Sequence, residues 1–124
     1  MSKKKTFVTL EQHKEIDKTY PTPYHLYDEK GIRENAKRLK EAFSWNKGYR
    51  EYFAVKATPN PYILKILKDY GCGVDCASMA ELMMGYALDY KPEEIMFSSN
   101  DTPAEEYAYA NEIGATINLD DITH

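Results

Sequence analysis

The sequence predicts an α/β fold that contains about the first four strand–helix units of a (β/α)8 barrel. Strand-like runs recur, their ends about 20 residues apart, and helical patterns fill the intervals. These runs span residues 52–57, 73–78, 95–100 and 115–120. Strands that alternate with helices of this length pair in parallel through right-handed crossovers. A complete barrel needs about 250 residues, so 124 residues could supply about half of one; a small open sheet is the alternative.

The helices have recognisable ends. Asn60 is a typical N-cap residue, Pro61 suits the first helical position, and Gly71 ends that helix. Residues 78–81 have the spacing of a capping box at the start of a second helix, and residues 102–105 repeat it before a third. An earlier amphipathic helix is expected over residues 30–43.

The predicted domain organisation has two parts. Residues 1–28 form an N-terminal tail with a short strand at 24–27, and residues 29–124 form the first half of the barrel. The basic run at residues 3–5 is expected to be a solvated part of that tail.

Composition excludes several classes of function. A net charge of -4 and a pI near 5.4 argue against a nucleic-acid partner. No apolar stretch approaches the roughly 20 residues of a membrane span, and nothing resembles a signal peptide, so we expect a cytoplasmic protein without a membrane partner. Cys72 and Cys76 lack the second ligand pair of a zinc site, so we expect free, buried thiols and no metal.

Lys56 is the first candidate for chemistry. Side chains alternate along a strand, which places Lys56 on one face with Tyr52 and Ala54, at the strand's carboxyl end, where barrel active sites lie. Desolvation lowers the pKa of a lysine and would supply the neutral amine that imine formation needs. The alternative is a structural lysine that is ion-paired with Asp75 or Glu81.

Asp75 and Glu81 are the candidates that accompany Lys56. Asp75 shares a face of the next strand with Gly73 and Ala77, where it could pair with Lys56 or orient a cofactor. Position N3 of a capping box explains Glu81 without any ligand.

A half-barrel has consequences for association. Two strand edges remain unpaired and an apolar inner face is left exposed. We therefore expect the chain to dimerise, to aggregate or to need a partner.

Several segments in a fixed order resemble the alanine-racemase-like (fold type III) pyridoxal-phosphate decarboxylases, specifically their amino-terminal part. Residues 51–60 contain Tyr52-Phe53-Ala54-Val55-Lys56, and residues 73–82 contain Asp75-Cys76-Ala77-Ser78. The other matching segments are residues 22–28, 95–100 and 117–120. The diaminopimelate decarboxylases are the nearest branch, and residues 75–78 are also similar to ornithine decarboxylases. A racemase fits less well, because residues 57–61 differ from the run that follows the racemase lysine.

This resemblance implies a function for the candidate residues. Lys56 would be the Schiff-base lysine that holds pyridoxal 5'-phosphate, with Asp75 and Glu81 lining the cofactor region. The implied reaction converts meso-diaminopimelate to lysine and carbon dioxide in lysine biosynthesis, in a homodimer that binds a small amino-acid substrate.

The resemblance stops short of a complete enzyme. Nothing matches the family's ring-stacking histidine, its glycine-rich phosphate loop, its acidic residue at the pyridine nitrogen or its carboxy-terminal cysteine motif. We therefore expect an inactive amino-terminal fragment. The alternatives are a fragment of an ornithine- or arginine-type decarboxylase, and a non-catalytic module that pairs with an intact decarboxylase.

Overall fold

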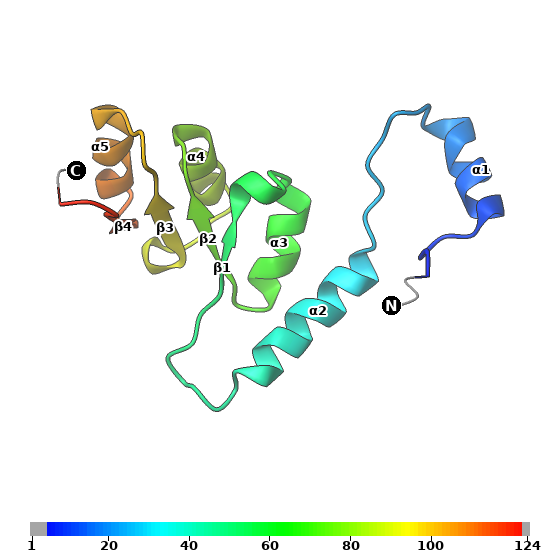
Figure 1. Ribbon diagram of the computed structural model, residues 1–124, viewed down its shortest axis with the longest axis horizontal. Helices are drawn as coiled ribbons and strands as arrows, with labels where there is room; N and C mark the ends of the chain where they lie inside the picture. The colour runs from blue at the N-terminus through cyan, green and yellow to red at the C-terminus, as the bar shows by residue number, and fades with distance from the viewer. Residues whose placement is uncertain (1–4, 123–124) are drawn as a thin grey trace.

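Four parallel strands form one sheet whose spatial order follows the sequence. The structure, a computed structural model, describes residues 5–122. Each strand pairs with the next one along the chain, as Figure 1 shows. The strands are β1 (Tyr52–Ala54), β2 (Gly73–Cys76), β3 (Ile95–Ser98) and β4 (Thr116–Asn118). This order, with a helix after each of the first three strands, confirms the α/β class and a partial barrel. Part of the basic run at 3–5 and the last two residues lie outside the described range.

Every strand ends earlier than its pattern predicts. The largest difference concerns β1, which ends at Ala54 and continues into a 3₁₀ helix, η1 (Val55–Ala57). The turn closes where the Thr58 N–H donates to the Val55 carbonyl at 3.0 Å. The prediction that Lys56 belongs to a strand is therefore wrong, because local hydrogen bonding replaces the ladder two residues before it.

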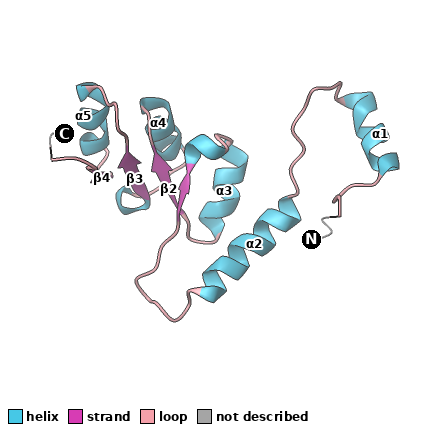
Figure 2. Cartoon of the chain, in the orientation of Figure 1, coloured by secondary structure: helices cyan, strands magenta, loops and turns pink. Residues whose placement is uncertain are grey.

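The predicted helices are present. They are α2 (Glu29–Ala42), α3 (Pro61–Asp69), α4 (Met79–Ala87) and α5 (Ala104–Glu112), and a 3₁₀ turn, η2 (Pro92–Glu94), precedes β3 (Figure 2). The Asn60 side chain accepts from the Tyr62 N–H at 3.0 Å, which confirms the cap of α3, and Gly71 follows with a φ of 85°. The predicted cap of α5 at Thr102 is wrong, because Pro103 is the N-cap and no side chain caps the helix.

The N-terminal segment differs from its prediction. It contains a helix, α1 (Leu10–Thr19), and no strand at residues 24–27. Thr9 and Gln12 form a capping box, and the Tyr24 hydroxyl donates to Asp17 at 2.7 Å. None of the residues of α1 is buried, and the helix stands apart from the sheet in Figure 1. Its contacts are therefore local ones, and residues 24–27 have no strand to pair with.

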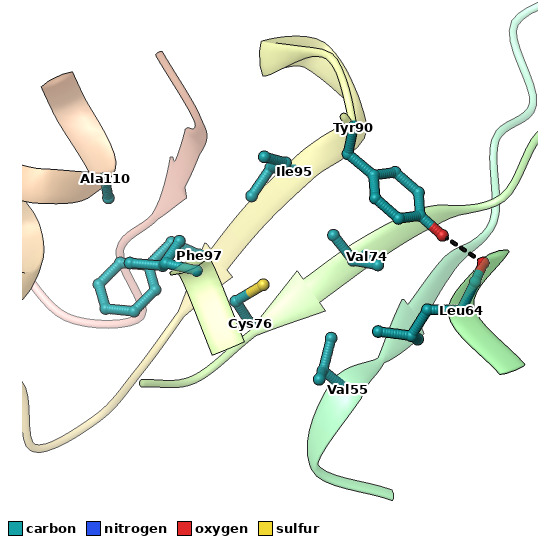
Figure 3. Close-up of a cluster of buried hydrophobic side chains, with 9 residues drawn as sticks. Val55, Leu64, Val74, Cys76, Tyr90, Ile95, Phe97 and Ala110 are labelled. Carbon is teal, nitrogen blue, oxygen red and sulfur yellow. Dashed lines mark hydrogen bonds between the residues drawn. The ribbon is translucent and has the colours of Figure 1, made fainter. Parts of the chain in front are cut away.

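The main core lies between the sheet and helices α3 to α5. Its strand side chains come from alternate positions that face the helices, as expected for a sheet covered on that face. Figure 3 shows the cluster. Its buried members are Val55, Leu64, Val74, Cys76, Leu82, Tyr90, Ile95, Phe97 and Ala110. Gly85 lets α4 approach the sheet closely, since a Cβ there would lie 3.2 Å from Val74 Cγ2.

A second apolar cluster attaches α2 to α3. Ala36 of α2 packs with Ile63, Leu67 and Cys72. At its edge Arg33 donates to Glu29 at 2.8 Å and to Asp69 at 3.2 Å. These ion pairs are solvent-accessible, so the apolar contacts stabilise this packing more than the charges do.

Tyr90 connects the end of α4 to α3 inside the main core. Its hydroxyl donates to the Leu64 carbonyl at 2.7 Å, drawn as the dashed line in Figure 3. Lys68 Nζ lies 5.1 Å from the centroid of the Tyr90 ring and donates to the Leu88 and Asp89 carbonyls. Burial is the main cause that raises the pKa of Tyr90.

Replacing Tyr90 by phenylalanine should destabilise the fold. The change Tyr90→Phe removes the buried hydrogen bond to the Leu64 carbonyl, and the loss of one such bond typically costs about 0.5–1.5 kcal/mol. Urea unfolding followed by circular dichroism measures the difference, and Tyr86→Phe, at an exposed tyrosine of α4, is the matched control. Equal unfolding midpoints for the two variants would contradict this assignment.

Candidate functional site

The two faces of the sheet differ in character. Residues paired across parallel strands point to the same face, so the register separates the helix-covered face from an inner face. The inner-face residues are Tyr52, Ala54, Gly73, Asp75, Met96, Ser98, Thr116 and Asn118. Because Asp75, Ser98, Thr116 and Asn118 have polar side chains, the prediction of an apolar inner face is only partly correct.

Lys56 lies just beyond the carboxyl end of β1, in η1. Its side chain is exposed, and among residues 5–122 it makes no ion pair or hydrogen bond. The structural alternative, a pair with Asp75 or Glu81, is therefore not observed. The expectation that the amine is shielded from water is wrong in this structure, because Lys56 sits on an exposed turn rather than in a packed strand. A primary amine at the carboxyl edge of parallel strands is nevertheless placed where such folds carry out chemistry.

Asp75 occupies the inner face of β2, as the alternation predicted. Its Cα partners are Ala54 on β1 and Met96 on β3. Although the residue is half-buried, its Oδ1 atom is enclosed and has no hydrogen-bond partner among residues 5–122. An enclosed carboxylate oxygen without a donor is costly unless a ligand or a further part of the protein supplies one.

Glu81 holds the loop that leads from β2 into α4. Its Oε2 atom accepts from the Ala77 N–H at 2.7 Å, while Ser78 Oγ accepts from the Glu81 N–H at 3.4 Å. The Glu81 carboxylate therefore accepts from the N–H of Ala77. In the predicted capping box it would accept from the N–H of Ser78, the N-cap residue. From α5, Glu106 accepts from the Met79 N–H at 3.0 Å. The two carboxylates together fix the backbone directly after Asp75.

Polar groups that sequence reasoning did not assign also lie at this edge. The Asn118 side chain donates to Ser98 Oγ across β3 and β4 at 3.4 Å. The hydroxyl of Thr102, in the loop that follows β3, is buried and has no hydrogen-bond partner in the described part of the chain. The alternation of side chains along a strand could have placed Ser98 and Asn118 on the same face. Nothing local in the sequence indicates that Thr102 is enclosed.

The two cysteines are free and buried, as predicted. Burial, together with the nearby Glu81 and Asp75 carboxylates, raises the pKa of Cys76 to about 12. Burial is also the main cause that raises the pKa of Cys72. Among residues 5–122, no group of three or more potential metal-ligating side chains occurs. Within the same range, no helix has the length and apolarity needed to cross a bilayer.

The sheet defines a class of protein, a segment of an α/β barrel, and Lys56 lies at the edge where its parallel strands end. Residues 29–123 match the family described as pyridoxal-dependent decarboxylase, pyridoxal binding domain. The chain belongs to this family, which confirms the resemblance seen in its sequence.

Curated relatives agree with this family. The chain is 43% identical over 107 residues to Protein TabA of Pseudomonas amygdali pv. tabaci, covering 86% of this chain and 25% of that protein. It is 33% identical over 107 residues to diaminopimelate decarboxylase of Methanothermobacter thermautotrophicus, with the same shares covered. The chain therefore spans about a quarter of the length of these relatives.

Solved structures match the fold. A diaminopimelate decarboxylase from Helicobacter pylori, complexed with L-lysine, superposes with a TM-score of 0.80 at 31% identity. The match covers 90% of this chain and 28% of that one. An ornithine decarboxylase from Entamoeba histolytica gives a TM-score of 0.77 at 28% identity, covering 91% and 34% of the two chains.

The buried thiols predict how stability depends on pH. A thiol whose folded-state pKa is about 12, against an ordinary value of 9.0, binds its proton more tightly in the folded protein. The contribution of this thiol to the free energy of unfolding is therefore complete below pH 9 and is lost as the pH rises toward 12. The free energy of unfolding falls by up to about 1.4 kcal/mol per pH unit for each proton that only the folded protein retains.

Urea unfolding at pH 8, 9 and 10 measures this dependence. The wild type should lose stability over this range, and Cys76→Ala, although less stable at pH 8, should lose less. A wild-type stability that stays constant from pH 8 to pH 10 would contradict the enclosed thiol.

Proposed function

We propose that this chain is the amino-terminal, lysine-bearing portion of a pyridoxal-phosphate-dependent decarboxylase that acts on meso-diaminopimelate. The observation that carries the proposal is the position of Lys56 at the carboxyl edge of the sheet, where its amine is accessible and forms no ion pair with any of residues 5–122. The diaminopimelate decarboxylases among the relatives support the substrate. We also propose a domain boundary near residue 29, and the start of the family match at that residue supports it.

The residues present fit the cofactor. Pyridoxal phosphate, when bound, supplies an electron sink for the loss of carbon dioxide from an amino acid. Lys56 provides the amine that holds it. Asp75 contributes an enclosed acceptor oxygen that lacks a donor, which suits a nitrogen-bearing group on the inner face.

Glu81 serves the site through the backbone. By accepting from Ala77 it fixes the residues that follow Asp75, and so holds the direction in which the Asp75 carboxylate points. Its proposed role is thus to position Asp75, and not to contact the cofactor. The sequence had suggested only that Glu81 lines the cofactor region.

Chemical trapping tests Lys56 as the cofactor lysine. The protein is incubated with pyridoxal phosphate and reduced with borohydride, and its peptides are then analysed by mass spectrometry. The pyridoxyl label should concentrate on Lys56, whereas Lys56→Arg should abolish it there and Lys65→Arg, at an exposed lysine of α3, should leave it unchanged. A label distributed evenly over the surface lysines would overturn the proposal.

The isolated chain should release little or no carbon dioxide from meso-diaminopimelate. The reason is that it spans about a quarter of its relatives' length, so the groups that they place elsewhere in their sequences are not provided. Release of radiolabelled carbon dioxide measures this, with a full-length diaminopimelate decarboxylase as the positive control. Turnover at a rate comparable to the control would refute the expectation.

A further inference from the structure

We propose that Glu106 is a positioning residue of the candidate site. From α5 it holds the start of α4, and through α4 it holds the loop that follows Asp75. The inference rests on the proposed function, because it gives Glu106 a part in the same site.

Three hydrogen bonds hold the residues that lead from β2 into α4. The N–H of Met79, the first residue of α4, donates to Glu106 Oε1 at 3.0 Å. The Ala77 N–H donates to Glu81 at 2.7 Å, and the Glu81 N–H donates to Ser78 Oγ at 3.4 Å. The first N–H groups of a helix have no partner inside the helix. Of the three acceptors, only Glu106 comes from outside this loop and helix, so it fixes their position relative to the next strand–helix unit.

The sequence at the start of α5 explains why the Glu106 carboxylate is available for this contact. Glu106 is the third residue of α5, the position from which a glutamate in a capping box accepts from the N–H of its own N-cap residue. The N-cap residue of α5 is Pro103, which has no N–H. The Glu106 carboxylate therefore accepts from Met79 of the neighbouring helix, with which α5 is in contact. It lies near the amino ends of two helices, whose dipoles favour a negative charge there.

The segment that Glu106 holds adjoins the turn that carries Lys56. Asp75 is the Cα partner of Ala54, the last residue of β1, and the chain continues from Ala54 into η1. The turn η1 is in contact with β2. A displacement of the start of α4 would therefore be transmitted along the loop to Asp75, and would change how its carboxylate lies relative to the Lys56 amine.

Amide hydrogen exchange measured by NMR tests the hydrogen bond in this chain. Glu106→Ala should speed exchange of the Met79 N–H by about tenfold or more, because the bond to a charged acceptor is lost. Glu106→Gln keeps an oxygen acceptor and should exchange at close to the wild-type rate. Glu105→Ala, at the exposed preceding residue of α5, is the matched control and should leave the rate unchanged. Circular dichroism verifies that each variant is folded.

Trapping with pyridoxal phosphate and borohydride then tests the effect on the site. The cofactor concentration that half-saturates the label on Lys56 should rise several-fold in Glu106→Ala, and should return close to the wild-type value in Glu106→Gln. The label on exposed Lys65 of α3, measured in the same sample, should be equal in all variants. A residue that only stabilised the fold would not change the labelling of Lys56 alone in protein that remains folded.

The outcomes separate this inference from the proposed function. A wild type whose label shows no preference for Lys56 would overturn both. If the wild type labels Lys56 selectively and Glu106→Ala labels it with the same concentration dependence, the inference is overturned and the proposed function stands. An unchanged exchange rate of the Met79 N–H in Glu106→Ala would also overturn the inference, because the contact that carries it would be absent.

Discussion

The parallel pairing of consecutive strands is the constraint on which the rest of the structure depends. Through the register of β1 with β2, Ala54 lies beside Asp75, and through that of β3 with β4, Ser98 lies beside Asn118. Parallel strands bring all carboxyl ends to one edge. Polar groups that are far apart in the sequence therefore gather at the edge where Lys56 lies.

The helix-covered face maintains this pairing. Val74, Ile95 and Phe97 are at most 1% exposed and pack against α3 to α5. This apolar burial is the main stabilising contribution to the sheet. The Tyr90 hydroxyl and the amine of Lys68 add directed contacts that join α3 to the loop after α4. The core thus determines which strand faces point inward, and thereby which residues can form the site.

Local sequence patterns predict most of the fold, because helix ends and strand alternation depend on residues that are close together in the chain. Asn60, Pro61 and Gly71 mark helix ends through their own backbone preferences, and the structure agrees. The end of β1 was misplaced because the alternation of residues 52–57 continues past the point where a 3₁₀ hydrogen bond replaces the ladder. Helix α1 was missed although Thr9 and Gln12 form a capping box, since no residue of the helix joins a core that would mark it by periodic burial.

The sequence predicts those parts of the candidate site that depend only on the alternation of side chains between the two faces of a strand. That rule placed Asp75 on the inner face correctly. It could not reveal that one carboxylate oxygen of Asp75 is enclosed without a donor, or that Glu81 accepts from Ala77, because both depend on how a loop folds over neighbouring elements. The exposure of Lys56 likewise depends on a turn rather than on its place in a pattern.

Nuclear Overhauser contacts between backbone protons test the strand arrangement most directly. The account predicts contacts between the partner pairs Phe53 and Val74, Val74 and Ile95, and Phe97 and Ile117. Contacts that instead join β1 to β3 or β4, or that show antiparallel pairing, would remove the common carboxyl edge and with it the site built around Lys56.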